Sequence, residues 1–97
     1  MIIDAHCHIM PDSFPKRHAE LSAIDATYAS LFPNPNPKMA TAENLIQAMQ
    51  EADVDRSVVM GMGWGSRKLV QESNDYIIKS IVTFPNQLEG FCSVNPA

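Results

Sequence analysis

Short apolar segments bounded by turn-forming residues recur three times along the chain. Residues 2–9, 56–60 and 89–94 are rich in β-branched and other apolar side chains. Turn residues follow the first segment at Pro11 and the third at 95–96, and proline is found at the ends and edges of strands rather than in their middle. The pattern therefore predicts three short strands.

The clearest helical pattern lies between the first two strands. Its apolar residues recur at i, i+3, i+4 and i+7, which is the spacing of one helix face; they are Leu45, Ala48, Met49 and Ala52. Thr41 is a suitable N-cap, and Glu43 places a negative charge in the first turn, where it favours the helix dipole. We expect this helix to begin after Thr41 and to end near Asp53.

The other segments are less regular. Residues 16–30 predict one helix, with Leu21, Ile24, Tyr28 and Leu31 spaced for one face. Three prolines within 33–37 favour an extended connector, because proline lacks an amide donor and restricts the residue before it. A glycine-rich loop is predicted at 61–66. A further helix should run from residue 67 or 69 to 82, and Asn74 is a candidate point of interruption.

The order of these elements indicates the fold class. A strand, a long insertion with a helix, a strand, a helix and a strand follow one another, and such alternation favours right-handed βαβ units in a parallel sheet. Neither face of the first strand looks solvated, which is typical of strands covered on both sides. The 97 residues show no internal repeat and suit one domain. The sequence therefore predicts a single α/β domain over residues 1–97, a parallel βαβαβ segment.

Composition and charge exclude several classes of protein. The formal net charge of −4 disfavours contact with phosphate backbones, so we expect no nucleic-acid partner. The chain has no apolar run of about 20 residues, so we expect no membrane span. Its first residues lack the basic and long apolar regions of a signal peptide, which favours the cytoplasm. In that reducing compartment Cys7 and Cys92 are expected to be buried thiols rather than a disulfide.

His6 and His8 are the most informative residues for function. Residues two apart in a strand point the same way with Cα atoms about 6.6 Å apart, so the two imidazoles can bind one metal ion. They also lie at the carboxyl end of the first predicted strand, where parallel α/β folds place their sites. The alternative is a pair of histidines that are only hydrogen-bonded or solvated.

Strict alternation decides which neighbours share the face of this histidine pair. It places Asp4 on the same face, and it places Cys7 on the opposite face and outside the site. We expect Asp4 to accept a hydrogen bond from an imidazole and so to orient a metal ligand. The alternative for Asp4 is a polar residue deeper in the strand.

The opening Ile3-Asp4-Ala5-His6-Cys7-His8 resembles the first strand of the amidohydrolase superfamily of metal-dependent hydrolases. More narrowly, the chain is similar to the amidohydrolase-related branch that includes aminocarboxymuconate-semialdehyde decarboxylase. Further similar motifs follow in the same order; they lie at 45–59, 74–77, 84–86, 88–91 and 94–96. The resemblance covers nearly all of the chain, and residues 11–40 are its least similar part.

The resemblance implies a fold and a metal site. The fold is a (β/α)8 TIM barrel, and His6 and His8 match the first two ligands of its divalent metal, expected to be Zn²⁺. The family takes a further histidine and an aspartate from later strands, which this sequence does not contain. A full barrel has about 250 residues, so the chain corresponds to its N-terminal third. His18 is expected to be a solvated side chain beside Lys16 and Arg17.

The resemblance also implies a reaction. A bound zinc ion activates water and polarises a substrate oxygen, which serves hydrolysis or decarboxylation of a small carboxylated or carbonyl substrate. Catalytic zinc usually has three protein ligands, so we expect the 97-residue chain alone to be inactive. The alternative is a non-catalytic fragment that self-associates through the open edge of the barrel, as a homo-oligomer.

The glycine-rich segment 61–66 is a candidate phosphate-binding loop, because it follows one predicted strand and precedes a helix. It does not match G-x-G-x-x-G, since Ser66 occupies the last glycine position. We therefore expect a loop at the mouth of the barrel. Trp64 in this loop is a candidate substrate contact, and packing against a neighbouring loop is the favoured alternative.

Overall fold

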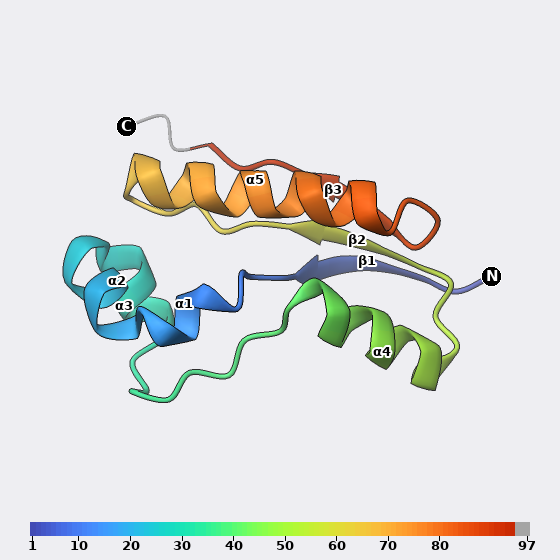
Figure 1. Cartoon of the computed structure of the whole chain (residues 1–97), viewed down its shortest axis with the longest axis horizontal. Helices are drawn as coiled ribbons and strands as arrows, with labels where there is room; N and C mark the ends of the chain where they lie inside the picture. Colours follow the sequence, from blue (N-terminus) through green and yellow to red (C-terminus); the bar gives the residue numbers. More distant parts are fainter. Residues whose placement is uncertain (95–97) are drawn as a thin grey trace.

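Three parallel strands form one sheet in the computed structural model, which describes residues 1–94 (Figure 1). They lie in the order β1-β2-β3, and their bounds are Ile3–His8, Arg56–Met60 and Leu88–Phe91. The predicted α/β class and its parallel βαβαβ order are confirmed over this part of the chain. The third strand is shorter than predicted, and its expected stop at 95–96 lies outside the described residues.

The helix between the first two strands, α4 (Ala42–Ala52), forms as predicted. The hydroxyl of Thr41 accepts a hydrogen bond from the backbone amide of Asn44, and the side chain of Asn44 accepts one from the amide of Thr41. This reciprocal capping box satisfies two amides that the first turn would leave unpaired. The helix ends at Asp53, which adopts a left-handed conformation with φ of 54°.

The last helix, α5 (Arg67–Thr83), begins where the hydroxyl of Ser66 accepts a hydrogen bond from the amide of Leu69. The interruption considered at Asn74 does not occur, because α5 is continuous there. The side-chain amide of Asn74 instead hydrogen-bonds a residue far along the chain. It donates to the carbonyl of Ser93 and accepts from the amide of Ser93, both at 2.8 Å, and so ties α5 to the segment after β3.

Residues 11–40 differ most from the sequence prediction. In place of one helix over 16–30, the chain forms three short helices, which are α1 (Ser13–Lys16), α2 (His18–Ile24) and α3 (Ala26–Leu31). Asp25 interrupts the helical path, because its backbone is extended, with φ of −138°, and its carboxylate caps α3. The three helices gather beyond the carboxyl ends of the strands, at the left of Figure 1.

Two apolar cores hold these elements together. The first joins the sheet to α4 and α5, and its buried residues are Ile9, Ala42, Met49, Val59, Ile77 and Leu88. The second lies among α1, α2, α3 and the start of α5, and its buried residues are Met10, Phe14, Leu21, Tyr28, Trp64 and Leu69. The carboxyl end of β1 therefore leads directly from the first core into the second.

Helices cover one face of the sheet, and within residues 1–94 the opposite face is open. Val59 and Leu88 are buried under α4 and α5, whereas Ile3 and Phe91, on the other face, are 55% and 65% exposed. The expectation that the strands are buried on both faces is therefore wrong for this structure, because no second layer covers that face. Cys92, which was expected to be buried, is exposed as well.

The first strand contains a local irregularity that changes its alternation. Asp4 pairs with Ser57 and Cys7 pairs with Val59, so three steps along β1 match two steps along β2. The extra residue is a β-bulge, which re-aims the side chains on one side of it. Asp4 and Cys7 consequently share the helix-covered face with Ser57 and Val59. The predicted shared face of Asp4 with the histidines is wrong for this reason.

Among the described residues, no helix has both the length and the apolar character that crossing a bilayer requires.

Candidate metal centre

The imidazole rings of His6 and His8 meet at the carboxyl end of β1. Their Nε2 atoms are 3.1 Å apart, and the rings are nearly perpendicular, with centroids 4.9 Å apart. His6 is exposed to solvent and His8 is partly buried. The irregularity lies between Asp4 and Cys7, and the rings of His6 and His8 still meet as the i, i+2 spacing predicts.

A backbone contact fixes the chemical form of His8. Its Nδ1 atom lies 3.0 Å from the carbonyl oxygen of Met60, on the neighbouring strand β2. A carbonyl oxygen only accepts, so Nδ1 carries the proton and, in the neutral ring, the lone pair lies on Nε2. Metal-binding histidines commonly use their second nitrogen in this way. The Nε2 atom of His8 is therefore set to accept a proton or a metal ion.

The spacing of the two nitrogens fits one shared metal ion. Two nitrogens each about 2.0–2.1 Å from zinc lie about 3.3 Å apart at the tetrahedral angle and about 2.9 Å apart at a right angle. The distance of 3.1 Å falls between these values. The same distance also suits a hydrogen bond in which the His6 ring donates to His8, so both alternatives from the sequence share this geometry.

The pair accounts for only part of a metal centre. Among residues 1–94, no group of three or more histidine, cysteine, aspartate or glutamate side chains is placed to hold a metal ion. Catalytic zinc usually has three protein ligands and structural zinc has four. His6 and His8 together can therefore supply two ligands, and any further ones must come from elsewhere.

Asp4 acts on the backbone of the strand rather than on a histidine ring. Its carboxylate accepts a hydrogen bond from the amide of His6, and it lines a groove against α4 with Leu45 and Met49. The thiol of Cys7 and the amide of His6 both hydrogen-bond the carboxylate and lower the pKa of Asp4. The predicted role of orienting an imidazole is not what this contact does, because the bulge turns Asp4 to the other face.

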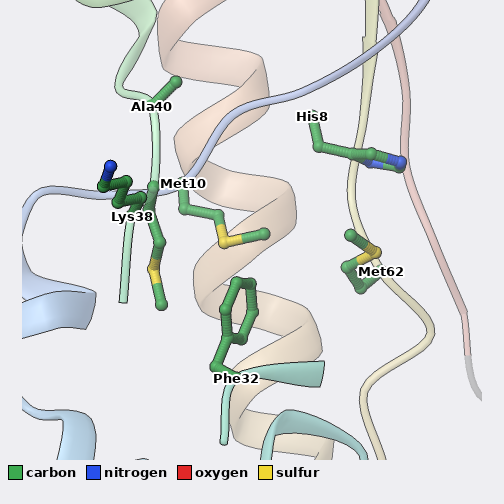
Figure 2. Close-up of a pocket in the computed structure, with 7 residues that line it drawn as sticks. His8, Met10, Phe32, Lys38, Ala40 and Met62 are labelled. Carbon is green, nitrogen blue, oxygen red and sulfur yellow. The ribbon is translucent and has the colours of Figure 1, made fainter. Parts of the chain in front are cut away.

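A small cavity opens beside His8. It measures about 180 Å³ and is lined by His8, Met10, Phe32, Lys38, Met39, Ala40 and Met62. Figure 2 shows His8 and Lys38 on opposite sides of it, with Met10 and Phe32 between them. Three methionines and one phenylalanine make its walls apolar, and the side-chain nitrogen of Lys38 points away from it.

No motif in the sequence singles out the Lys38 side of this cavity. Residues 38–40 reach His8 because the amide of Met10 donates to the carbonyl of Ala40 at 2.9 Å. That contact joins the end of the proline-rich connector to the segment directly after β1. The proline-rich connector could have indicated this contact, since an extended segment of this kind must run over another part of the fold.

Trp64 lies in the second core rather than at the histidine pair. Its side chain is fully buried, its Nε1–H donates to the hydroxyl of Ser73 at 2.7 Å, and its ring packs against Phe14 and Tyr28. The packing interpretation of Trp64 agrees with this position, whereas a substrate contact does not. The loop of residues 61–66 is therefore anchored through its tryptophan.

His18 is not the solvated side chain that the sequence predicted. It is the first residue of α2 and is partly buried, and its Nδ1 atom lies 3.0 Å from the hydroxyl of Tyr28. Tyr28 belongs to α3, so this contact joins two of the short helices. His18 is therefore a structural residue, separate from the pair formed by His6 and His8.

Comparison with models of protein families, with curated proteins and with solved structures finds no match for this chain.

Proposed function

We propose that this chain contributes two histidine ligands to a zinc centre that hydrolyses or decarboxylates a small carboxylated or carbonyl substrate. The observation that carries the proposal is the geometry of His6 and His8. Their Nε2 atoms are 3.1 Å apart, and the carbonyl of Met60 holds the proton of His8 on Nδ1. Two imidazoles prepared in this way can share a metal ion, because the Nε2 lone pair of His8 is free to bind one.

The cavity beside His8 supports a small organic substrate. Its apolar walls suit a ring or a short hydrocarbon chain. A volume of about 180 Å³ admits only a small molecule.

The chain's own residues would have limited and distinct roles. His6 and His8 hold the ion, and Met60 fixes the orientation of His8 through its carbonyl. Met10, Met62 and Phe32 exclude water from the substrate's apolar part. A bound zinc ion would supply an activated water and a polarising charge for the substrate oxygen.

The wider assignment is also a proposal. The open sheet face, the parallel order and the site at the carboxyl end of β1 are compatible with the first part of a (β/α)8 barrel of the amidohydrolase type. We place the chain in the cytoplasm, where Cys7 and Cys92 would stay reduced; both are free thiols in the structure.

Metal binding is the direct test of this proposal. We expect the purified chain to bind Zn²⁺, and Co²⁺ as a spectroscopic substitute, in a titration followed by calorimetry and visible absorption. Replacing either histidine, by His6→Ala or His8→Ala, should weaken binding at least about 10-fold, because each removes one of two ligands.

The matched control is His18→Ala, which removes the chain's third histidine at a distance from the pair. Circular dichroism of each variant checks that the fold is retained. Equal metal affinity in the wild-type chain and in a folded His6→Ala/His8→Ala double variant would refute the ligand assignment.

A further inference from the structure

The two-histidine site has too few ligands for zinc and faces a side of the molecule that can be approached. His6 is exposed, and it lies with His8 on the sheet face that α4 and α5 leave open. Structural zinc in proteins binds four ligands in a tetrahedron, twice the number that His6 and His8 provide. A second copy of the same site would supply the missing pair.

The surroundings of the site suit contact with another protein surface. His8, Met60 and Phe91 form one row across the three strands, since His8 pairs with Met60 and Met60 pairs with Phe91. Phe91 is 65% exposed. Ile3, on the same face, is 55% exposed, so the open face presents more than one apolar side chain that a partner surface can cover.

The charges on this face do not oppose such contact. Arg56 and Glu89, which β2 and β3 place on it, form an ion pair at 2.8 Å and so cancel each other. The whole chain, in contrast, carries a formal charge of −4, so two copies repel one another at long range. A divalent cation between two facing sites would offset part of that repulsion.

We propose that two copies of this chain share one zinc ion, with His6 and His8 of each copy as its four ligands, and that the open sheet faces meet around it. The proposal rests on the proposed zinc binding by His6 and His8. The open sheet face of one copy then contacts that of the other, and the two copies associate only when the metal is bound. A two-fold axis through the ion relates the copies, so each contributes the same surface.

This arrangement has a chemical consequence. Four imidazoles fill the tetrahedral coordination of zinc, and no position remains for water or substrate. The zinc-linked dimer is therefore a closed form of the site, and catalysis would require that one pair of histidines be replaced by other groups.

The test measures mass and stoichiometry together. Sedimentation equilibrium of the metal-free chain should give the 10.7 kDa monomer, and added Zn²⁺ should double that mass at one ion per two chains. A chelator should restore the monomer. The His6→Ala/His8→Ala variant should stay monomeric with zinc, whereas His18→Ala should dimerise like the wild type.

A second pair of variants tests the surface without touching the ligands. Phe91→Arg places a charge on the same face as the histidines without adding a zinc ligand, and it should weaken zinc-dependent dimerisation at least about 10-fold, since it sets like charges against each other across the interface. Val82→Arg is the matched control, because Val82 is 75% exposed on α5, outside the sheet. It should leave dimerisation unchanged.

The outcomes separate the two proposals. A monomer that binds one zinc ion per chain would overturn the shared site and leave the metal-ligand assignment standing. A chain that binds no zinc would overturn both. A dimer that forms equally without metal, or in the double histidine variant, would show that the contact does not depend on these four side chains.

Discussion

Asp25 is a buried carboxylate that connects two parts of the fold. It is 2% exposed and accepts hydrogen bonds from the amide of Tyr28 at 3.0 Å and from the amide of Ser66 at 2.7 Å. Tyr28 lies in α3, and Ser66 is the N-cap of α5. One side chain therefore holds the short helices against the loop that carries Trp64.

The protonation of Asp25 is linked to stability. Burial favours the neutral acid, but hydrogen bonds from backbone amides, led by that of Ser66, outweigh it and hold the pKa of Asp25 below its usual value. A carboxyl group whose pKa is lower in the folded state stabilises the fold above its unfolded pKa of about 4. That contribution is lost as the pH falls through the folded pKa.

We predict that Asp25→Asn lowers the free energy of unfolding by about 1–3 kcal/mol at pH 7, because amides that pointed at a carboxylate lose an ionised acceptor. The variant should also lose part of the decrease in stability that the wild type shows below about pH 4. Urea denaturation at both pH values measures this. Asp75→Asn, at an exposed position of α5, is the control; an equal effect there would contradict the prediction.

At the same scale, the histidine pair could be predicted and the position of Asp4 could not. His6 and His8 are two residues apart in one strand, and that local spacing is enough to predict that their rings meet. Asp4 lies across the bulge, whose existence depends on pairing with β2. That pairing is a long-range property, and the residues of β1 by themselves do not encode it.

Among the elements, α4 depends most clearly on a short local signal. Thr41 and Asn44 satisfy each other's backbone amides at its first turn. We predict that Thr41→Ala lowers the free energy of unfolding by about 1 kcal/mol, since the amide of Asn44 loses its partner. Thermal and urea unfolding measure the change.

The control for this element is Gln50→Ala, an exposed position on the same helix where alanine is the better helix former. It should leave stability unchanged or raise it slightly. A Thr41→Ala chain as stable as the wild type would mean that water satisfies the freed amide equally well.

The helices also show which elements a sequence pattern can locate. The positions of α4 and α5 can be predicted, because each helix has an apolar stripe and an N-cap residue close to it in the sequence. The single helix expected over 16–30 fails at Asp25, where capping of α3 and the contact to Ser66 favour an extended residue. Ile24 and Leu31, assigned to its buried face, are 52% and 48% exposed as a result.

At the scale of the whole molecule, the fold is a helix layer on a sheet layer. Its principal extents are 41 × 29 × 19 Å, and the shortest of them leaves room for little more than two layers. The alternation of strands and helices was sufficient to predict the parallel sheet. It was not sufficient to predict the open face, because apolar residues on a strand indicate that a face can be covered but not what covers it.

This architecture leads to a prediction about activity. We expect the zinc-loaded chain to turn over neither an activated aryl ester nor an aromatic carboxylic acid faster than the His6→Ala/His8→Ala variant does. The reason is that the described residues provide two metal ligands where catalytic zinc usually has three. Release of the phenol and of CO₂ are the two readouts, and faster turnover by the wild type than by the double variant would refute it.

The bulge in β1 has a consequence for engineering. It divides six residues into two parts that can be varied separately: Asp4 and Cys7 belong to the helix side, whereas His6 and His8 belong to the open side. A designer can therefore retune the packing under α4 on one face of β1 and the imidazoles on the other, provided that the hydrogen bond from the His6 amide to Asp4 is kept. If the alternation of β1 were unbroken, Asp4 would share a face with His6 and His8. A substitution at Asp4 would then alter the surroundings of the metal site directly.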